Sequence, residues 1–255
     1  MFFEQYIAAS QLKGENIVPE LTLKQRIHAG ETVIGVGLPY TADRDYVEGL
    51  LDRHAYDFCH VDVQHSPINE EAILLFCAIA HDFGLPIKMR IKHARDAYLI
   101  GNYLDLGLSG IEIPSAELES TVDEAINALF YPPTGRRSWG EPHSGPGIPT
   151  DRIGHAKWYD NYGMLWLQIE SILGVTNARR LAKPGVDCFS FGPNDLNFDI
   201  ETYPAHPLDS VDKCVKHVLE QLVGSTAAVC FRTTQDNRQK YADMGVTVIL
   251  ESANV

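Results

Sequence analysis

The sequence predicts a (β/α)8 TIM barrel, an α/β fold in which eight parallel strands alternate with helices. The chain has 255 residues, the usual length of one such barrel. Short β-rich runs recur along it, and nearly all are followed by a helical pattern. Eight such runs are present, and eight parallel strands close a barrel without leaving an edge.

The first predicted element is a helix in ELTLKQRIHAG, residues 20–30, which ends at Gly30. We expect this helix to close the bottom of the barrel. The predicted strands follow at residues 32–38, 57–63, 86–91, 110–114, 164–170, 186–193, 226–231 and 246–250. The predicted helices of the outer layer lie at residues 43–54, 69–84, 95–107, 118–130, 174–183, 206–224 and 236–245.

The last predicted strand is followed only by ESANV, so we expect the final helix of the barrel to be incomplete or missing. Residues 131–155 hold five prolines and five glycines, too many for a helix or a central strand. A long irregular segment inside a compact domain is usually functional. No internal repeat or low-complexity linker divides the chain, which predicts a single domain over residues 1–255.

The charge of the chain argues against nucleic acid and anionic membranes as partners. It carries 21 basic and 34 acidic residues, a formal net charge of -13. No apolar run reaches the length of about 18 residues that a membrane span needs, and no secretory signal is visible. The five cysteines form no CxxC pair, so we interpret them as reduced core residues and expect a cytoplasmic protein.

On three of the predicted strands, polar residues stand two positions apart and therefore share one face of the strand. Asp62 shares a face with His60, Arg90 shares one with Lys88, and Gln168 shares one with Glu170. In a barrel, inward residues near the carboxyl ends of the strands line the active site. A single polar residue at a strand end can simply be leaving the core, but three strands with matching parity favour a site.

The stretch FGPNDLN places Asp195 directly after another predicted strand. We expect a tight turn at Gly192 and Pro193, with the backbone N–H groups of Asn194 and Asp195 available to an anion. Together with Glu170, Asp195 forms a pair of hard oxygen ligands that suits Mg2+ or Mn2+, with Co2+ as a further candidate. A purely structural hydrogen-bond network is the alternative. The sequence contains no HExxH motif and no Cys/His cluster, so we expect a zinc site less than a magnesium or manganese site.

With these residues assembled, the chain resembles the HpcH/HpaI aldolase family from about Leu23 to Leu250. The resemblance rests on HVDVQHSP, IKMRI, YPPTGRR, LQIE and FGPNDL, in this order and at strand ends. It implies a metal-dependent α/β barrel that cleaves or forms a carbon–carbon bond next to a 2-oxo acid. The implied partners are a small 2-oxo acid, an aldehyde and further copies of the chain in a homo-oligomer.

The resemblance also implies roles for individual residues. Glu170 and Asp195 would hold the metal, and Gln168 would either support the metal ligands or contact the substrate. From the stretch FGPNDLN itself, we expect Asn194 and Asp195 to contact the substrate. Arg90 would face the substrate oxyanion, which a planar guanidinium positions better than a flexible amine. His65, oriented by Asp62, would act as the base that takes the hydroxyl proton in the cleavage direction.

The chain departs from the family pattern in three places. Gln64 stands where many relatives have glutamate, which removes a charge beside the expected base. The ending VILESANV replaces the glycine-rich turn and terminal helix that relatives exchange between subunits, so the subunit number stays open. The segment after YPPTGRR varies among relatives, which leaves the acceptor open.

Two alternatives remain at this stage. The first is a Schiff-base aldolase that uses Lys88, which shares an inward face with Arg90. The second is a barrel that has lost catalysis and acts only as a binding or scaffold protein. A lyase for acyl-CoA thioesters is a related possibility, but no basic patch for a nucleotide phosphate stands out.

Overall fold

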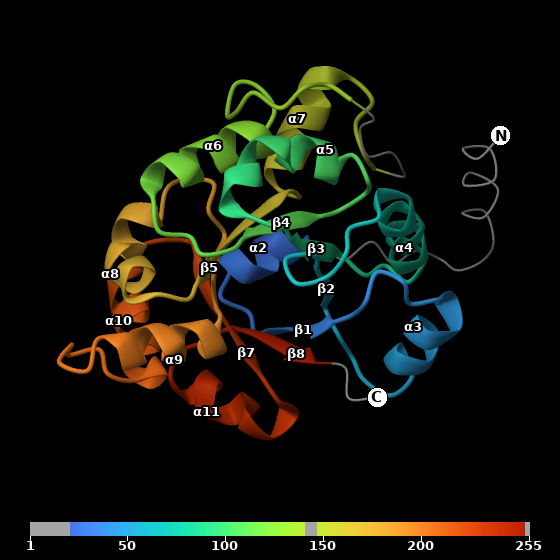
Figure 1. Ribbon diagram of the computed structural model, residues 1–255. Coiled ribbons are helices and arrows are strands. Elements are labelled where there is room, and N and C mark those ends of the chain that lie inside the picture. Colours follow the sequence, from blue (N-terminus) through green and yellow to red (C-terminus); the bar gives the residue numbers. More distant parts are fainter. Residues whose placement is uncertain (1–20, 141–146, 253–255) are drawn as a thin grey trace.

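Eight parallel strands close into a barrel in chain order in this computed structural model, which describes residues 21–140 and 147–252. The strands are β1 (Val33–Gly37), β2 (Phe58–Asp62), β3 (Ile87–Arg90), β4 (Gly110–Ile113), β5 (Met164–Ile169), β6 (Cys188–Phe191), β7 (Ala228–Thr233) and β8 (Val248–Ser252). Figure 1 shows the ring of strands with helices around it. All eight predicted strands and the predicted (β/α)8 barrel are confirmed.

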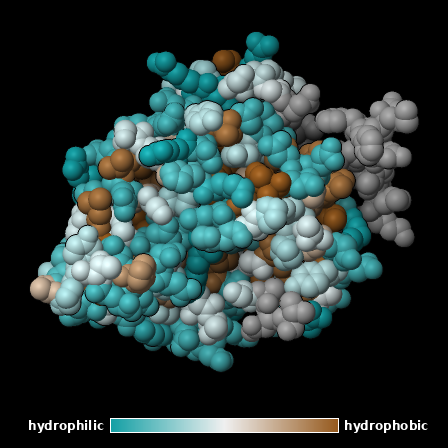
Figure 2. Space-filling model, in the orientation of Figure 1, coloured by the Kyte–Doolittle hydropathy of each residue, from teal (hydrophilic) through white to brown (hydrophobic). Residues whose placement is uncertain are grey.

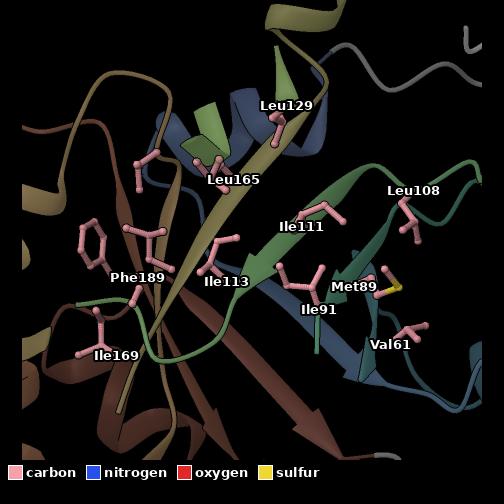
Figure 3. Packing of buried hydrophobic residues seen from close by; sticks show 14 of the residues in the cluster. Val61, Met89, Ile91, Leu108, Ile111, Ile113, Leu129, Leu165, Ile169 and Phe189 are labelled. Carbon is pink, nitrogen blue, oxygen red and sulfur yellow. The ribbon is translucent and has the colours of Figure 1, made fainter. Parts of the chain in front are cut away.

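The helices of the outer layer connect these strands. They are α3 (Arg44–Leu51), α4 (Glu70–Asp82), η1 (Ala94–Leu99), α5 (Ile100–Leu104), α6 (Glu119–Leu129), α7 (Arg152–Asp160), α8 (Ile172–Leu181), α9 (Pro193–Thr202), α10 (Val211–Gln221), η2 (Gln235–Asn237) and α11 (Arg238–Asp243). Their apolar faces pack on the outward side chains of the strands. Figure 3 shows part of this core, with Ile111, Leu165 and Phe189 from strands and Leu129 from the end of α6. The described residues end with β8, so the expected incomplete or missing final helix lies outside them.

The predicted N-terminal helix is α2 (Leu23–His28), which lies over the centre of the ring in Figure 1. Thr22 and Gln25 cap its start reciprocally through side-chain and backbone hydrogen bonds. Leu23 and Ile27 belong to the apolar cluster that fills the interior of the barrel. The other buried members of this cluster are Val33, Phe58, Met164, Trp166, Cys188, Cys230, Val248 and Leu250. The helix therefore closes the amino-terminal end of the barrel.

Above this apolar layer, the inward positions become polar towards the carboxyl ends of the strands. Asp62 on β2 is in register with Arg90 on β3, and Arg90 is in register with Glu112 on β4. Gln168 on β5 is paired with Ser190 on β6. Because side chains alternate faces along a strand, these five residues all point into the barrel. They line one polar depression at this end of the barrel, called the cup below.

Two helices lie where the sequence predicts irregular chain or a turn. The segment expected to be irregular up to residue 155 contains the start of α7, whose N-cap Asp151 accepts from the backbone of Gly154 at 2.7 Å. The predicted tight turn at Gly192 and Pro193 is wrong, because Pro193 is the first residue of α9. Proline suits this position since the first helical residue needs no backbone donor.

The five cysteines are all free and buried, as predicted for core residues. Within the residues that the structure describes, no helix has both the length and the apolar character needed to cross a membrane. Figure 2 shows one face of the molecule, on which hydrophilic residues predominate and apolar ones form scattered patches.

Candidate active site

The guanidinium of Arg90 is held on two sides at the carboxyl end of β3. Its Nε donates to Oδ1 of Asp62 at 2.9 Å, and its Nη2 donates to Oδ2 of the same carboxylate. Its Nη1 donates to Oε1 of Gln168 at 2.9 Å. Arg90 is buried, so these bonds fix the plane and direction of its charge. The structure thus brings together three residues that the sequence predicted for one site.

Asp62 is committed to Arg90 rather than to His65. Burial by itself raises the pKa of Asp62, but the hydrogen bonds and charge of Arg90, with the backbone N–H of Gln64, bring that pKa below its ordinary value. His65 is exposed on the loop that follows β2. No hydrogen bond joins His65 to Asp62 among the described residues, so the expected orientation of the base by this carboxylate is not formed.

The loop that carries His65 is nevertheless anchored to the barrel. The backbone N–H of Gln64 donates to Oδ1 of Asp62 at 2.9 Å, and the hydroxyl of Ser66 donates to the carbonyl of Asp62 at 2.6 Å. Lys92, just beyond β3, donates to the carbonyl of Ser66 at 2.9 Å. These bonds hold the backbone on both sides of His65.

Glu170 lies directly after β5, and its two carboxylate oxygens differ sharply. Oε1 accepts from the backbone N–H of Ser115 at 3.0 Å and from the hydroxyl of the same residue. Oε2 is buried and has no hydrogen-bond partner in the described part of the chain. A Cβ atom on Gly192 would lie 2.7 Å from this oxygen, so glycine leaves the space beside it open.

Asp195 is exposed in the first turn of α9, after β6, the strand adjacent to β5. Asn194 is exposed beside it. Burial raises the pKa of Glu170, and the nearby charge of Asp195 raises it further, against the lowering effect of Ser115 and Arg90. The two predicted metal ligands therefore lie at the same end of the barrel and influence each other electrostatically.

A divalent cation fits this arrangement. A buried carboxylate oxygen without a donor, next to a second carboxylate, is stabilised by a cation placed between them. Within residues 21–140 and 147–252, no group of three or more His, Cys, Asp or Glu side chains could hold a metal ion. Glu170 and Asp195 are the two carboxylates that could hold such an ion, with its remaining positions open to water and substrate, as is usual for Mg2+.

A buried cluster of charged side chains lies under this cup, and two of its members, Glu112 and Arg232, are not among the site residues predicted from the sequence. Glu112 on β4 accepts from Lys88 on β3 and, at 3.0 and 3.2 Å, from Nη2 of Arg232 on β7. Nδ1 of His60 lies 3.7 Å from Glu112. The ammonium of Lys88 also lies over the ring of Trp166, 4.2 Å from its centre.

The charges of this cluster are set by burial and by one another. Burial alone raises the pKa of Glu112, but Lys88 and Arg232 bring it well below its ordinary value. Burial and the same two cations bring the pKa of His60 well below its ordinary value, so His60 is neutral near pH 7. In the sequence, Glu112 and Arg232 could have been recognised as site residues because each is the single charged residue of its strand, GIEI and AVCFRT.

The chain is similar in sequence to known proteins. The sequence profile of the family described as HpcH/HpaI aldolase/citrate lyase matches residues 43–249. A hydroxypyruvate/pyruvate aldolase from Roseobacter denitrificans is 26% identical over 251 residues, which cover 93% of this chain and 92% of that protein. A 5-keto-4-deoxy-D-glucarate aldolase from Shigella boydii is 26% identical over 206 residues, with 78% of each chain covered.

The fold is also shared with a solved structure. The crystal structure of an HpcH/HpaI aldolase from Desulfitobacterium hafniense superimposes with a TM-score of 0.77 at 24% identity, covering 91% of this chain and 90% of that one. This likeness concerns the whole barrel.

Proposed function

Because the chain belongs to the HpcH/HpaI aldolase/citrate lyase family, a family of carbon–carbon lyases, we propose that it is a divalent-metal-dependent aldolase. Its substrates would be a pyruvate-like 2-oxo acid and an aldehyde, and its ion would be Mg2+ or Mn2+. The observation that carries the proposal is the buried Oε2 of Glu170, which has no described donor and lies near the charge of Asp195.

Glu170 and Asp195 would hold the metal, with Asn194 and Asp195 contacting the substrate at the start of α9. When bound, the metal would supply positive charge beside the oxo and carboxylate oxygens of the 2-oxo acid. Gln168 would fix the direction of Arg90 through the 2.9 Å hydrogen bond between them and contact the substrate. Arg90 would stabilise the negative oxygen that develops when the 2-oxo acid becomes an enolate.

In the cleavage direction, the hydroxyl next to the breaking bond loses its proton and becomes the carbonyl of the aldehyde. The electrons of the carbon–carbon bond pass to the 2-oxo acid fragment as an enolate, which is then protonated on carbon. We propose His65 as the group that takes the hydroxyl proton, directly or through water. Asp62 would support the site by orienting Arg90 and by shaping the loop that bears His65.

The proposal is tested with Glu170→Gln, which keeps the size of the side chain and removes its charge. Calorimetric titration should show Mn2+ affinity lowered by more than about 100-fold. A loss of up to about 100-fold is typical of residues that only orient a metal ligand, so a larger loss indicates a direct ligand. Glu117→Gln is a matched control, since Glu117 also accepts from a serine hydroxyl, that of Ser171 at 2.6 Å. Equal Mn2+ affinity in wild type and Glu170→Gln would refute the metal site.

A Schiff-base route through Lys88 is less well supported. Burial lowers the pKa of Lys88, which would favour a nucleophile, but its ammonium is fully buried and paired with Glu112. A substrate carbonyl would have to displace both this pair and the contact with Trp166. Borohydride in the presence of pyruvate should therefore leave Lys88 unmodified, and EDTA should abolish activity that Mg2+ or Mn2+ restores. A borohydride-trapped adduct at Lys88 would favour the lysine route.

We also propose that the protein acts in the cytoplasm as a homo-oligomer. Large apolar side chains are exposed on the outer helices, among them the neighbouring Leu74 and Leu75 on α4. Clustered exposed apolar groups are typical of interaction surfaces. Light scattering after size-exclusion chromatography should give a mass of at least twice 28.4 kDa, the mass of one chain.

A further inference from the structure

Asp199 links the two segments that carry the proposed metal ligands. Its Oδ2 accepts a hydrogen bond of 2.7 Å from the backbone N–H of Ile172. Ile172 is the first residue of α8 and stands two positions after Glu170. Asp199 lies in α9, four positions after Asp195. A side chain of α9 therefore holds the start of the helix that follows Glu170.

Asp195 and Asp199 lie on one face of α9, because residues four positions apart in a helix are one turn apart on the same side. The charge of Asp195 raises the pKa of Glu170, so this face is directed towards the end of β5. Leu196 and Ile200 are buried and hold the helix on the barrel through apolar contacts. Such contacts are not directional, so polar contacts set the tilt of the helix.

Two polar contacts fix α9 against β5 and α8. The backbone N–H of Gly192, the N-cap residue of α9, donates to the carbonyl of Ile169 at the end of β5 at 3.0 Å. The bond from Ile172 to Asp199 holds the second turn of α9. Two points define the direction of a helix axis, whereas one point lets the helix tilt about its start. Loss of the Asp199 bond would therefore change the separation of the two proposed ligands.

The half-buried carboxylate of Asp199 satisfies a donor that α8 itself cannot satisfy. The first N–H groups of a helix have no partner within it, and a negative charge beside them is favourable. Asp199 is not placed as a third metal ligand, because no group of three or more His, Cys, Asp or Glu side chains in the described part of the chain could hold a metal ion. It can influence a bound ion through the position of Asp195.

We propose that Asp199 is a positioning residue that sets the separation of Glu170 and Asp195, and with it the affinity and the size selectivity of the metal site. This inference rests on the proposed function, which assigns both carboxylates to one divalent ion. Mg2+ demands near-ideal octahedral geometry at about 2.0–2.1 Å, whereas Ca2+ accepts irregular geometry at about 2.3–2.6 Å. A fixed separation of the ligands therefore favours the smaller ion, and a loosened one favours the larger.

The test is Asp199→Ala, which removes the hydrogen bond to Ile172. Calorimetric titration measures the affinity for Mn2+, and competition against Mn2+ gives the affinities for Mg2+ and Ca2+. We expect the Mn2+ and Mg2+ affinities to fall about 10- to 100-fold, as is usual when a residue that orients a metal ligand is lost. The Ca2+ affinity should fall less, so that the ratio of Mg2+ to Ca2+ affinity drops about 10-fold.

Asp199→Asn separates the hydrogen bond from the charge. The side-chain carbonyl of asparagine can still accept from the N–H of Ile172, while the negative charge is gone. The Mn2+ affinity of this variant should stay within about 3-fold of the wild type, because a partly exposed charge that is not a ligand contributes little. An affinity as low as that of Asp199→Ala would show that Asp199 acts through its charge or as a ligand, and would overturn the positioning role.

Asp151→Ala is the matched control. Asp151 also accepts from a backbone N–H in the first turn of a helix, that of Gly154 at 2.7 Å, but its helix α7 leads into the amino end of β5. Both alanine variants should lower the midpoint of urea unfolding, and only Asp199→Ala should change ion affinities.

The outcomes separate this inference from the proposed function. Wild-type protein that binds no Mn2+ would refute the metal-dependent function and this inference with it. Wild-type protein that binds Mn2+ as tightly as Asp199→Ala does would refute the role of Asp199 alone. An equal loss of affinity for all three ions in Asp199→Ala would indicate a general disturbance of the site and would also overturn the inference.

Discussion

Ser115 donates two hydrogen bonds to the same carboxylate oxygen of Glu170, one from its backbone N–H and one from its hydroxyl. Ser115 has φ of 45°, in the left-handed region that side-chain-bearing residues seldom adopt. Its contacts with Glu170 offset this backbone strain, and the other oxygen of Glu170 has no hydrogen-bond partner among the described residues. Ser115 therefore orients the carboxylate that we propose as a metal ligand.

Ser115→Ala removes the hydroxyl bond and keeps the strained backbone position. We expect Mn2+ affinity to fall about 10- to 100-fold, as is usual when a residue that orients a metal ligand is lost. Calorimetric titration checks this. Ser171→Ala is the control, because Ser171 donates to Glu117 and caps α8. It should lower the free energy of unfolding by about 1 kcal/mol and leave Mn2+ affinity unchanged.

Arg90→Lys keeps a positive charge but loses the planar guanidinium, which donates to Asp62 and Gln168 at the same time. We expect kcat to fall about 10²- to 10³-fold, the effect of removing one oxyanion donor, because the ammonium cannot hold both partners and face substrate. Steady-state kinetics with pyruvate and an aldehyde measure it. Unchanged kcat with a raised KM for pyruvate would instead give Arg90 a role in ground-state binding.

Two variants of the buried cluster should differ strongly in stability. Glu112→Gln leaves Lys88 and Arg232 without their carboxylate, and breaking a buried pair in this way costs about 3–5 kcal/mol. Lys88→Met leaves Glu112 paired with Arg232 and conserves volume against Trp166, so it should cost less than about 2 kcal/mol. Urea unfolding measures both. Equal losses would mean that Arg232 does not neutralise Glu112.

Asp62 should make stability depend on pH in the acid range. Its pKa in the folded protein lies below the ordinary value, so the ionised form is favoured by folding. Its contribution is present above the unfolded pKa of about 3.9 and is lost as pH falls through the folded pKa. The difference in unfolding free energy between wild type and Asp62→Asn should therefore shrink as pH is lowered from 5 towards 2, as urea unfolding can show. A constant difference would contradict it.

The strands could be predicted because, in short runs such as IKMRI and MLWLQIE, every second residue is apolar, and because these runs lie between helical patterns. The helix at α9 could not, because Gly-Pro-Asn-Asp is compatible with both a turn and a helix start. The choice depends on Leu196 and Ile200, which are buried by their contacts with the rest of the fold. Local sequence does not carry that information.

The sequence by itself determined the barrel and the end at which its site lies, since period and parity are local properties that each strand carries alone. It also pointed to Arg90, Gln168, Glu170 and Asp195, which lie at the carboxyl ends of β3, β5 and β6. Only the tertiary structure decided which charges meet: Asp62 binds Arg90 rather than His65, and Arg232 reaches Glu112 across 120 positions of sequence. Asp62 and Arg90 meet because β2 and β3 pair in this register, whereas Arg232 reaches Glu112 because closure of the barrel makes β7 and β4 face each other.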